Sequence, residues 1–467
     1  MKGTAWWAAT LALSAASGLS VSCAPAKTPG DAQPRLPSAA PAAPPQVAAQ
    51  PPASSPKEQA LQRKLGEALR YVSEVRGLPA RTNVRGQLIS RPEIERYIAD
   101  QLDHETPPDV LEASEALLYA FGTVDADFDY RASVIGLMSS ELLGFYDPKQ
   151  KTFFVGGDLA GEEADVTLWH ELVHALQDQH YDLSHVTDWQ PDLGDSQAAI
   201  HALAEGDATS AMLDAMLKPR GATALEVPQG LMRAQTVLGG AALTAPPVLV
   251  RSLLAPYVDG LAFTNALRRR GGFAAVDEAW RAPPVSTEQL LHTEKFLAHE
   301  PPVVVPLPPP PPNNPELHER FHDVMGEQSL RVLLEEWLPA KTAAEAAAGW
   351  GGDRVAIFAD DARKSWAVAW HLRFDDEASA RRALSAFTRA APLTDRQTIQ
   401  RDLAPPAPAK ASDKVCRGRH SQGPLALVRR GPDLAVTLGP FDRHPGPVQT
   451  DPDCAIALAW ASGFVTK

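Results

Sequence analysis

LWHELVHALQDQH, residues 168–180, contains the pattern H-E-x-x-H. On a helix, residues four positions apart lie one turn apart on the same face, so His170 and His174 point in the same direction. Two imidazoles at this spacing can share one Zn²⁺. Glu171 is too close to His170 to bind the same ion, but it can reach a metal-bound water as a general base.

H-E-x-x-H also arises by chance in roughly a few per cent of chains of this length, so the motif needs support from elsewhere. The next predicted helix, Gln197–Leu217, provides it, with Asp195 and Ser196 as N-cap candidates. In its middle, within ALAEGDA, Glu205 lies on an alanine-rich surface, where a carboxylate needs a cation or a strong donor. If the two helices pack together, Glu205 completes a His₂Glu site whose fourth position is open to water.

With these motifs the chain resembles zincin metallopeptidases of the gluzincin type, in which a glutamate on a second helix follows H-E-x-x-H. From about Leu142 to about Asp376 it also resembles a group of bacterial lipoproteins with a predicted zinc peptidase domain. Four pieces carry this resemblance: HELVHALQDQHYDL, ALAEGDA, PPVSTEQLLHTEKF and GWGGDR. The resemblance implies that Glu171 is the catalytic base. The Zn²⁺ ligands that it implies are His170, His174 and Glu205.

Two further roles stay open within this resemblance. In some gluzincins an acidic residue one turn after the third ligand orients a histidine. That position is Thr209 here, so the role would pass to Asp207 or Asp178. Gluzincins also often use a Tyr or His from a later segment to stabilise the oxyanion. Tyr257 and His292 are the candidates, although an ordinary core or surface position is the more common role for both.

The N-terminal residues read as an export signal followed by a tether. Residues 1–22 contain Lys2, an apolar stretch and then small residues, which indicates a signal peptide too short for a membrane span. Lipidation of Cys23 would anchor the exported chain to a membrane; Leu19 lies one position from the usual apolar site, and ordinary secretion is the alternative. Residues 23–56 are almost all Ala, Pro, Ser and Gln, which predicts a disordered tether.

The segment 57–300 is expected to be mainly helical. Apolar residues at helical spacing predict its first helices at Glu58–Val75, Arg91–Leu102, Leu111–Phe121 and Ala132–Leu143. The sequence LLGFYDPKQKTFFVGG then predicts a β-hairpin, because two aromatic-rich runs flank turn residues. In zincins an edge strand commonly lies beside the active-site helix and can pair with an extended peptide. This hairpin either supplies that edge or is purely structural.

Residues 301–315, PPVVVPLPPPPPNNP, predict a semi-rigid polyproline connector and a domain boundary. Beyond it a small α+β domain is expected at 316–467, beginning with a helix at Leu317–Leu338. The later elements are the alternating strands GWGGDRVAIFADD and KSWAVAWHLRF, a helix at Glu377–Arg389, and the strands LALVRR and LAVTLGP. Asp353 and Arg354, which follow two glycines, are expected to fix a turn rather than to bind substrate. Cys416 and Cys454 in an exported chain favour a disulfide.

The fold expected is therefore α+β: a mainly helical zincin-like metallopeptidase domain with a short hairpin, followed by a small α+β C-terminal domain. The net charge of −13 argues against a nucleic-acid partner. The expected function is that of an exported, lipid-anchored zinc metallopeptidase of the cell envelope that cleaves a peptide or protein substrate. Two alternatives are a scaffold or binding lipoprotein that keeps the fold and metal without turnover, and an enzyme held latent by its C-terminal domain.

Overall fold

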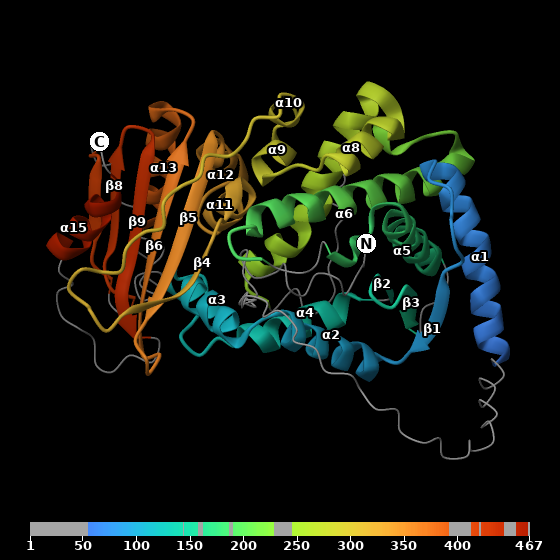
Figure 1. The fold of residues 1–467 in the computed structure, drawn as a ribbon, viewed down its shortest axis with the longest axis horizontal. Helices are drawn as coiled ribbons and strands as arrows, with labels where there is room; N and C mark the ends of the chain where they lie inside the picture. The colour runs from blue at the N-terminus through green and yellow to red at the C-terminus, as the bar shows by residue number, and fades with distance from the viewer. Residues whose placement is uncertain are drawn as a thin grey trace, which may run out of the picture.

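A computed structural model gives the arrangement of the chain (Figure 1), with a mainly helical part followed by a part built on a six-stranded sheet. The fold class is α+β, as predicted. The predicted signal peptide, including Cys23, and nearly all of the predicted tether lie outside the described residues. None of the helices in the described part combines the length and the apolar character that crossing a membrane requires. The structure describes residues 55–142, 144–156, 162–185, 190–227, 245–391, 412–419, 422–442 and 454–465.

The helical part surrounds a small three-stranded sheet. Its helices are α1 (Pro56–Arg76), α2 (Arg91–Glu105), α3 (Pro108–Ala120), α4 (Tyr130–Glu141), α5 (Glu162–Tyr181), α6 (Gly194–Leu217), α8 (Pro247–Arg281), α9 (Thr287–Leu291) and α10 (Thr293–Leu297). Short 3₁₀ turns lie at Leu183–His185, Lys218–Arg220 and Ala224–Glu226. The strands are β1 (Arg85–Ile89), β2 (Gly144–Asp147) and β3 (Thr152–Gly156). β3 lies in the middle, parallel to β1 and antiparallel to β2.

The predicted hairpin is confirmed as β2 and β3. Asp147 fixes its turn, because one carboxylate oxygen accepts hydrogen bonds from the backbone N–H of Lys149 at 2.7 Å and of Gln150 at 3.0 Å. β1 was not predicted. Its sequence RGQLI buries only Ile89, so it lacks the alternation that identifies a strand, and its pairing with β3 decides its conformation.

Helices α6 and α8 approach each other at backbone distance. A Cβ atom on Gly206 would lie 2.0 Å from the backbone of Gly260, and a Cβ atom on Gly260 would lie 1.8 Å from the carbonyl oxygen of Ala202. Real Cβ atoms do not come this close to backbone, so both positions require glycine. The contact sets the depth at which α6 lies between α5 and α8.

The second part is a sheet in the order β4-β5-β6-β9-β8-β7, with helices on both faces. Its strands are β4 (His318–Asp323), β5 (Trp350–Ala359), β6 (Ser365–Phe374), β7 (Lys414–Arg417), β8 (Leu425–Arg430) and β9 (Asp433–Asp442). Its helices are α11 (Gly326–Leu334), α12 (Ala340–Ala347), α13 (Glu377–Ala390) and α15 (Cys454–Phe464). Side chains alternate along β5: Val355 and Ile357 enter the large core beneath α11–α13, whereas Phe358 packs on the other face against Trp460 of α15.

The helix predicted at Leu317–Leu338 is wrong in its first part. Residues 318–323 form strand β4, and only Gly326–Leu334 is helical. The reason is tertiary, since β4 pairs antiparallel with β5 at the edge of the sheet. The α15 helix was also not predicted. The predicted disulfide is confirmed, as Cys416 at β7 is bonded to Cys454 at the start of α15.

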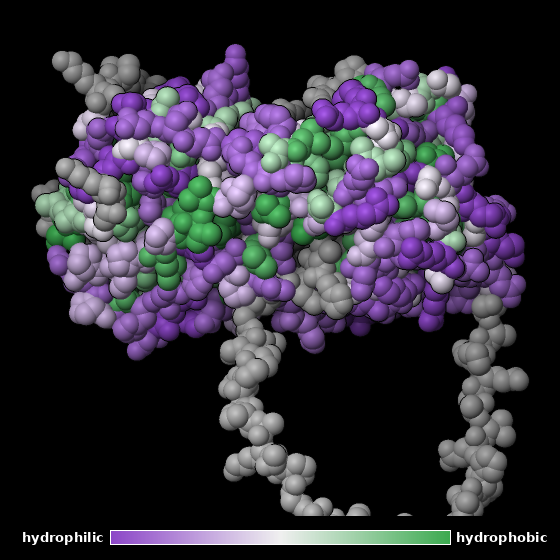
Figure 2. All heavy atoms as spheres, turned by 45° about the horizontal axis from the view of Figure 1, so that its top comes forward, coloured by the Kyte–Doolittle hydropathy of each residue, from purple (hydrophilic) through white to green (hydrophobic). Residues whose placement is uncertain are grey.

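The proline-rich segment after α10 is an extended strap on the C-terminal part. Exposure along it repeats every third residue, which matches the three residues per turn of polyproline II. The residues that face the protein are Pro302, Val305, Pro308 and Pro311. Trp460 donates a hydrogen bond through its indole N–H to the carbonyl oxygen of Pro309 at 2.9 Å. Val304 between them is 86% exposed, and Figure 2 shows apolar residues on this side of the molecule as separate patches among polar ones.

One hydrophobic core crosses the predicted boundary at 301–315. It contains side chains of α2, α3 and α4 together with inward-facing side chains of the six-stranded sheet. Hydrogen bonds reinforce the contact, since Arg419 donates to the carbonyl oxygen of Ala120 and Gln422 to that of Tyr119. The first helices therefore pack against the sheet that the end of the chain forms.

Two buried carboxylates lie where α6, α9 and α11 meet. Asp195 is not the N-cap that was predicted, because α6 begins at Gly194; its carboxylate accepts hydrogen bonds from Thr287 N–H at 3.0 Å and from the Thr287 hydroxyl at 2.5 Å. Asp353 accepts from the backbone N–H of Met325 at 2.8 Å and of Gly326 at 2.9 Å, and so fixes the start of α11. Burial raises the pKa of Asp195 to about 8 and that of Asp353 to about 6.

The same substitution should have opposite effects at two helical glycines. We expect Gly206→Ala to lower the free energy of unfolding by about 3 kcal/mol or more, because the added methyl group meets the backbone of α8. Gly136→Ala, in α4, should raise it by about 0.5–1 kcal/mol, because nothing lies within 4 Å of the new Cβ and alanine favours the helix. Denaturant unfolding of the two variants measures both values. A stable Gly206→Ala variant would contradict the close approach of the helices.

Asp195 should make the protein less stable as the pH rises. The folded protein keeps this proton up to about pH 8, whereas the unfolded chain loses it near pH 4, so the contribution is complete below about pH 4 and is lost on approaching pH 8. In the wild type, the free energy of unfolding should fall as the pH rises. We expect Asp195→Asn to reduce the slope of this fall by at most about 1.4 kcal/mol per pH unit. Urea unfolding between pH 5 and about 8 measures the slope. Equal slopes for the variant and the wild type would contradict the assignment.

Candidate metal centre

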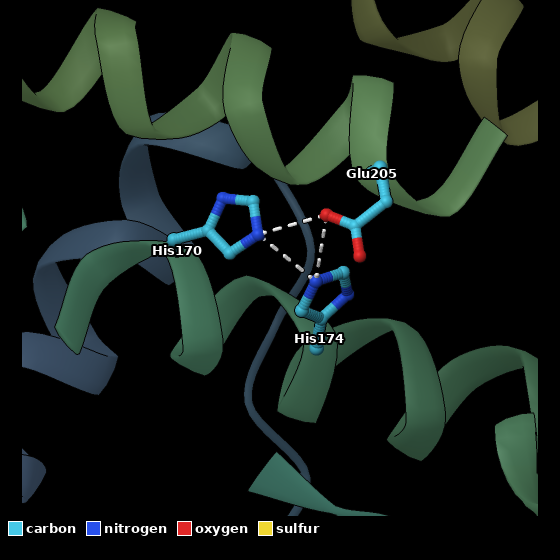
Figure 3. A group of neighbouring side chains, drawn as sticks. All are labelled: His170, His174 and Glu205. Carbon is cyan, nitrogen blue, oxygen red and sulfur yellow. Dashed lines mark hydrogen bonds and ion pairs between the residues drawn. The ribbon is translucent and has the colours of Figure 1, made fainter. Parts of the chain in front are cut away.

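Helices α5 and α6 bring His170, His174 and Glu205 together, as the sequence predicts (Figure 3). The Nε2 atom of His170 lies 3.0 Å from Oε2 of Glu205 and 3.1 Å from Nε2 of His174. The third side of this triangle, from His174 Nε2 to Glu205 Oε2, is 3.6 Å. Both rings and the carboxylate point toward one another from the facing sides of the two helices (Figure 3).

These separations can be compared with the geometry of a zinc site. Ligand atoms that each lie about 2.0–2.1 Å from a tetrahedral zinc ion are about 3.3 Å from one another. The three observed distances, 3.0, 3.1 and 3.6 Å, lie on both sides of that value. Two imidazole nitrogens and one carboxylate oxygen are also a donor set that Zn²⁺ takes in catalytic sites. The residues present therefore fit the metal that the motif implies.

The cluster is buried, and its carboxylate is ionised. The exposed fraction is 5% for His170, 1% for His174 and zero for Glu205. Burial alone would raise the pKa of Glu205, but the neighbouring His174 and hydrogen bonds from His170 and His174 outweigh it and hold that pKa well below its usual range. Burial lowers the pKa of His170. Burial would lower the pKa of His174 as well, but the nearby carboxylates of Glu205 and Glu171 outweigh burial and raise it to about 9. The group thus combines an ionised carboxylate with one imidazole that favours its neutral form and one that favours its protonated form. Neutral imidazole is the form that binds metals.

Glu171 lies beside the cluster and is fully buried. Its Oε2 atom accepts a hydrogen bond from the backbone N–H of Tyr146 at 3.0 Å, so strand β2 faces α5 at this residue. Its Oε1 atom has no hydrogen-bond partner among the residues that the structure describes. Burial is the largest influence on this carboxyl and raises its pKa to about 8, against the opposing effects of His174 and the Tyr146 N–H.

A chain of buried polar groups extends from His174 away from the cluster. The Nδ1 atom of His174 lies 2.8 Å from Oε1 of Gln177, whose Nε2 donates to Oδ2 of Asp207 at 3.0 Å and to the carbonyl oxygen of Ala204 at 3.1 Å. Asp207 in turn accepts from Nε of Arg76 at 2.6 Å. Asp207 therefore reaches the histidine through Gln177 and not directly.

Asp178, the other candidate for orienting a histidine, has different partners. It accepts from the Tyr146 hydroxyl at 2.7 Å and from Nζ of Lys151 at 2.8 Å. Gln177 was missed in the sequence, although its position three residues after His174 puts both side chains on one helix face. His201 was missed as well; its Nε2 lies 3.5 Å from Oε1 of Glu205, and its position one turn before Glu205 was the available signal.

Of the two residues considered for oxyanion stabilisation, one lies beside the cluster and the other does not. The ring of Tyr257, on α8, stacks against the ring of His170 with 6.0 Å between centroids. His292 instead pairs with Glu327 of α11, with 2.9 Å between Nε2 and Oε1. Tyr257 thus borders the cluster, whereas His292 belongs to the contact between α9 and α11.

A second group of carboxylates is held together by a lysine and not arranged as a metal site. Glu288, Glu300 and Asp375 come close together, but each accepts a hydrogen bond from Nζ of Lys295 at 2.7 Å. The lysine supplies the positive charge that the three carboxylates require. Elsewhere, a cavity of about 820 Å³ lies between the strap and the β8–β9 turn, lined among others by Val304, Arg373 and Arg430.

A family model described as a domain of unknown function, DUF8575, matches residues 316–440. This match covers the sheet from β4 into β9 and includes none of the residues of the α5–α6 cluster. No curated protein and no solved structure matches the chain.

Proposed function

We propose that the protein is a zinc-dependent metallopeptidase in which His170, His174 and Glu205 hold Zn²⁺ and Glu171 is the general base. The convergence of three ligand atoms from α5 and α6, 3.0–3.6 Å apart, carries the proposal. Its second support is the position of Glu171 on the same helix, with one carboxylate oxygen bonded to β2 and the other without a partner in the described part of the chain.

The division of labour follows from the positions of the side chains. When bound, Zn²⁺ supplies a Lewis acid that polarises the scissile carbonyl and acidifies a coordinated water. Glu171 takes a proton from the attacking water while the water oxygen bonds to the carbonyl carbon, and returns it to the amine as the C–N bond breaks. Tyr257, next to His170, is the better placed of the two residues considered for stabilising the oxyanion.

We also propose that the protein is exported and anchored through a lipid on Cys23. The disulfide between Cys416 and Cys454 supports export, because such bonds persist in oxidising compartments outside the cytosol. A peptide or protein of the cell envelope is then the natural class of substrate. Strand β2, which reaches Glu171 through Tyr146, is the proposed edge for an extended peptide.

The burial of the cluster favours a second candidate function. Glu171 and Glu205 have no exposed surface, so a peptide bond can reach them only if neighbouring segments move. A protein that uses bound metal to hold α5 and α6 together, and acts as an envelope scaffold or binding module without turnover, needs no such movement. Metal content and peptidase activity distinguish the two functions.

Metal binding should depend on the three clustered side chains. We expect the purified full chain to bind one zinc ion, and His170→Ala or Glu205→Ala to weaken zinc binding more than about 100-fold, since each removes a ligand. His180→Ala is the matched control: this histidine is on the same helix but bonds to the carbonyl oxygen of Pro79. Elemental analysis and chelator competition measure the affinities. Equal zinc binding by wild type and Glu205→Ala would contradict the ligand assignment.

Peptide cleavage should depend on Glu171 when zinc is bound. We expect Glu171→Gln to lower kcat/KM on a quenched-fluorescent peptide library by about 10²–10⁴-fold, because the amide cannot accept the proton. Zinc content should stay unchanged, and Glu67→Gln on the exposed side of α1 should cleave as the wild type does. Activity that survives Glu171→Gln would contradict the assignment of the base. Zinc binding without activity in the wild type would favour the scaffold.

A further inference from the structure

The side-chain amide of Gln177 has one orientation that its neighbours permit. Its Nε2 atom faces the carbonyl oxygen of Ala204 at 3.1 Å and Oδ2 of Asp207 at 3.0 Å. Both are oxygen acceptors, so the atom between them must be the NH₂ donor. A reversed amide would place an oxygen against two oxygens and lose both hydrogen bonds. The amide oxygen therefore faces His174.

This orientation determines which nitrogen of His174 carries a hydrogen. The Gln177 oxygen lies 2.8 Å from Nδ1 of His174 and can only accept, so Nδ1–H must donate to it. When the imidazole is neutral, its lone pair is then on Nε2. Nε2 is the atom that points at His170 and Glu205, at 3.1 and 3.6 Å.

Asp207 keeps Gln177 in place because it is itself fixed. Nε of Arg76 donates to Oδ1 of Asp207 at 2.6 Å, and the indole N–H of Trp280 donates to its Oδ2 at 3.0 Å. Gln177, Asp207 and Arg76 have no exposed surface. Water cannot replace a lost bond in such a chain without opening the packing, so each group has its orientation imposed by the next.

We propose that Gln177 is a positioning residue that selects Nε2 of His174 as the metal-coordinating nitrogen, and that Asp207, held by Arg76 and Trp280, keeps Gln177 in the required orientation. This inference rests on the proposed function, because it concerns the same metal centre. It extends that centre from α5 and α6 to α1, which carries Arg76, and to α8, which carries Trp280.

The first test compares zinc affinity in full-length variants by chelator competition. We expect Gln177→Leu, which keeps the volume but not the acceptor, to bind zinc about 10–100-fold more weakly. Gln289→Leu is the control: Gln289 is also buried and bridges two backbone groups, donating to Glu300 O and accepting from Val285 N, but it lies in α9. Both variants should lose stability without metal, whereas only Gln177→Leu should lose zinc affinity. Equal affinity losses would overturn the proposal.

A second pair of variants tests the role of Asp207. One of its oxygens accepts from Nε2 of Gln177 and from the indole N–H of Trp280, each at 3.0 Å, and the other accepts from Nε of Arg76 at 2.6 Å. Either orientation of the amide in Asp207→Asn turns its NH₂ group toward one of these donors, so we expect zinc to bind about 10–100-fold more weakly. Asp277→Asn is the control, because Asp277 also pairs with Arg76, at 2.7 Å, but its other partner is Tyr181 and not Gln177. Unchanged zinc affinity in Asp207→Asn, or equal losses in the two variants, would overturn the role of Asp207.

A spectroscopic readout follows the proton itself. In the Co²⁺-loaded full chain, a histidine bound through Nε2 shows its Nδ1–H as a paramagnetically shifted, exchangeable proton resonance. We expect that resonance of His174 to exchange slowly in the wild type and to broaden or vanish in Gln177→Leu. If Co²⁺ and Zn²⁺ fail to bind the wild type, this inference and the proposed function are both wrong. If they bind and Gln177→Leu changes neither affinity nor exchange, only this inference is wrong.

Discussion

The carboxylate of Glu205 has no contact with solvent, and the helical part of the molecule is arranged to satisfy it. Nitrogen atoms of His170, His174 and His201 lie within 3.6 Å of its oxygens, so imidazoles from α5 and from its own helix surround the carboxylate. A steric condition acts on the same turn, because the next residue, Gly206, touches the backbone of Gly260. α6 cannot rotate or withdraw without breaking one of these two conditions, and this fixes the side of α6 that faces α5.

Buried charges beyond the cluster join distant elements to it. Arg76 pairs with Asp207 and Asp277 and lies over the ring of Phe273, which ties α1 and α8 to α6. Such pairs add little net stability compared with apolar packing, but breaking one leaves an uncompensated buried charge, so they favour a single arrangement. A separate network at Asp195, Thr287, Gly326 and Asp353 joins the helical part to the sheet. Thr287 lies in the sequence PPVSTEQLLHTEKF and Asp353 in GWGGDR, so these two pieces contribute to this junction.

Local sequence patterns correctly predicted the features that depend on the residues of a single helix or turn. The spacing of His170 and His174 and the isolated Glu205 were sufficient to predict the cluster, and turn residues were sufficient to predict the hairpin. Strand β4 was wrongly predicted as helix and β1 was not predicted, because their conformation depends on pairing with β5 and β3. The residues that hold Gln177 in place could not be predicted for another reason. Arg76 and Asp207 are 131 positions apart in the sequence, and no periodicity relates them. Gln177 and His201 themselves lay within one turn of predicted ligands and could have been proposed from spacing alone.

The proline-rich strap has a simple composition, yet particular residues of it contact the protein at a regular spacing. Every third residue faces the protein: Pro302, Val305, Pro308 and Pro311. The carbonyl oxygen of Pro309 accepts a hydrogen bond from the indole N–H of Trp460. Each residue of a polyproline II helix turns the chain by a third of a revolution. Inserting or deleting one proline would therefore rotate every later side chain by a third of a turn, so that other residues would face the protein. Inserting or deleting three residues would leave the same side chains facing the protein. Low-complexity sequence is usually tolerant of slippage, but here the length of the run is constrained in steps of three residues.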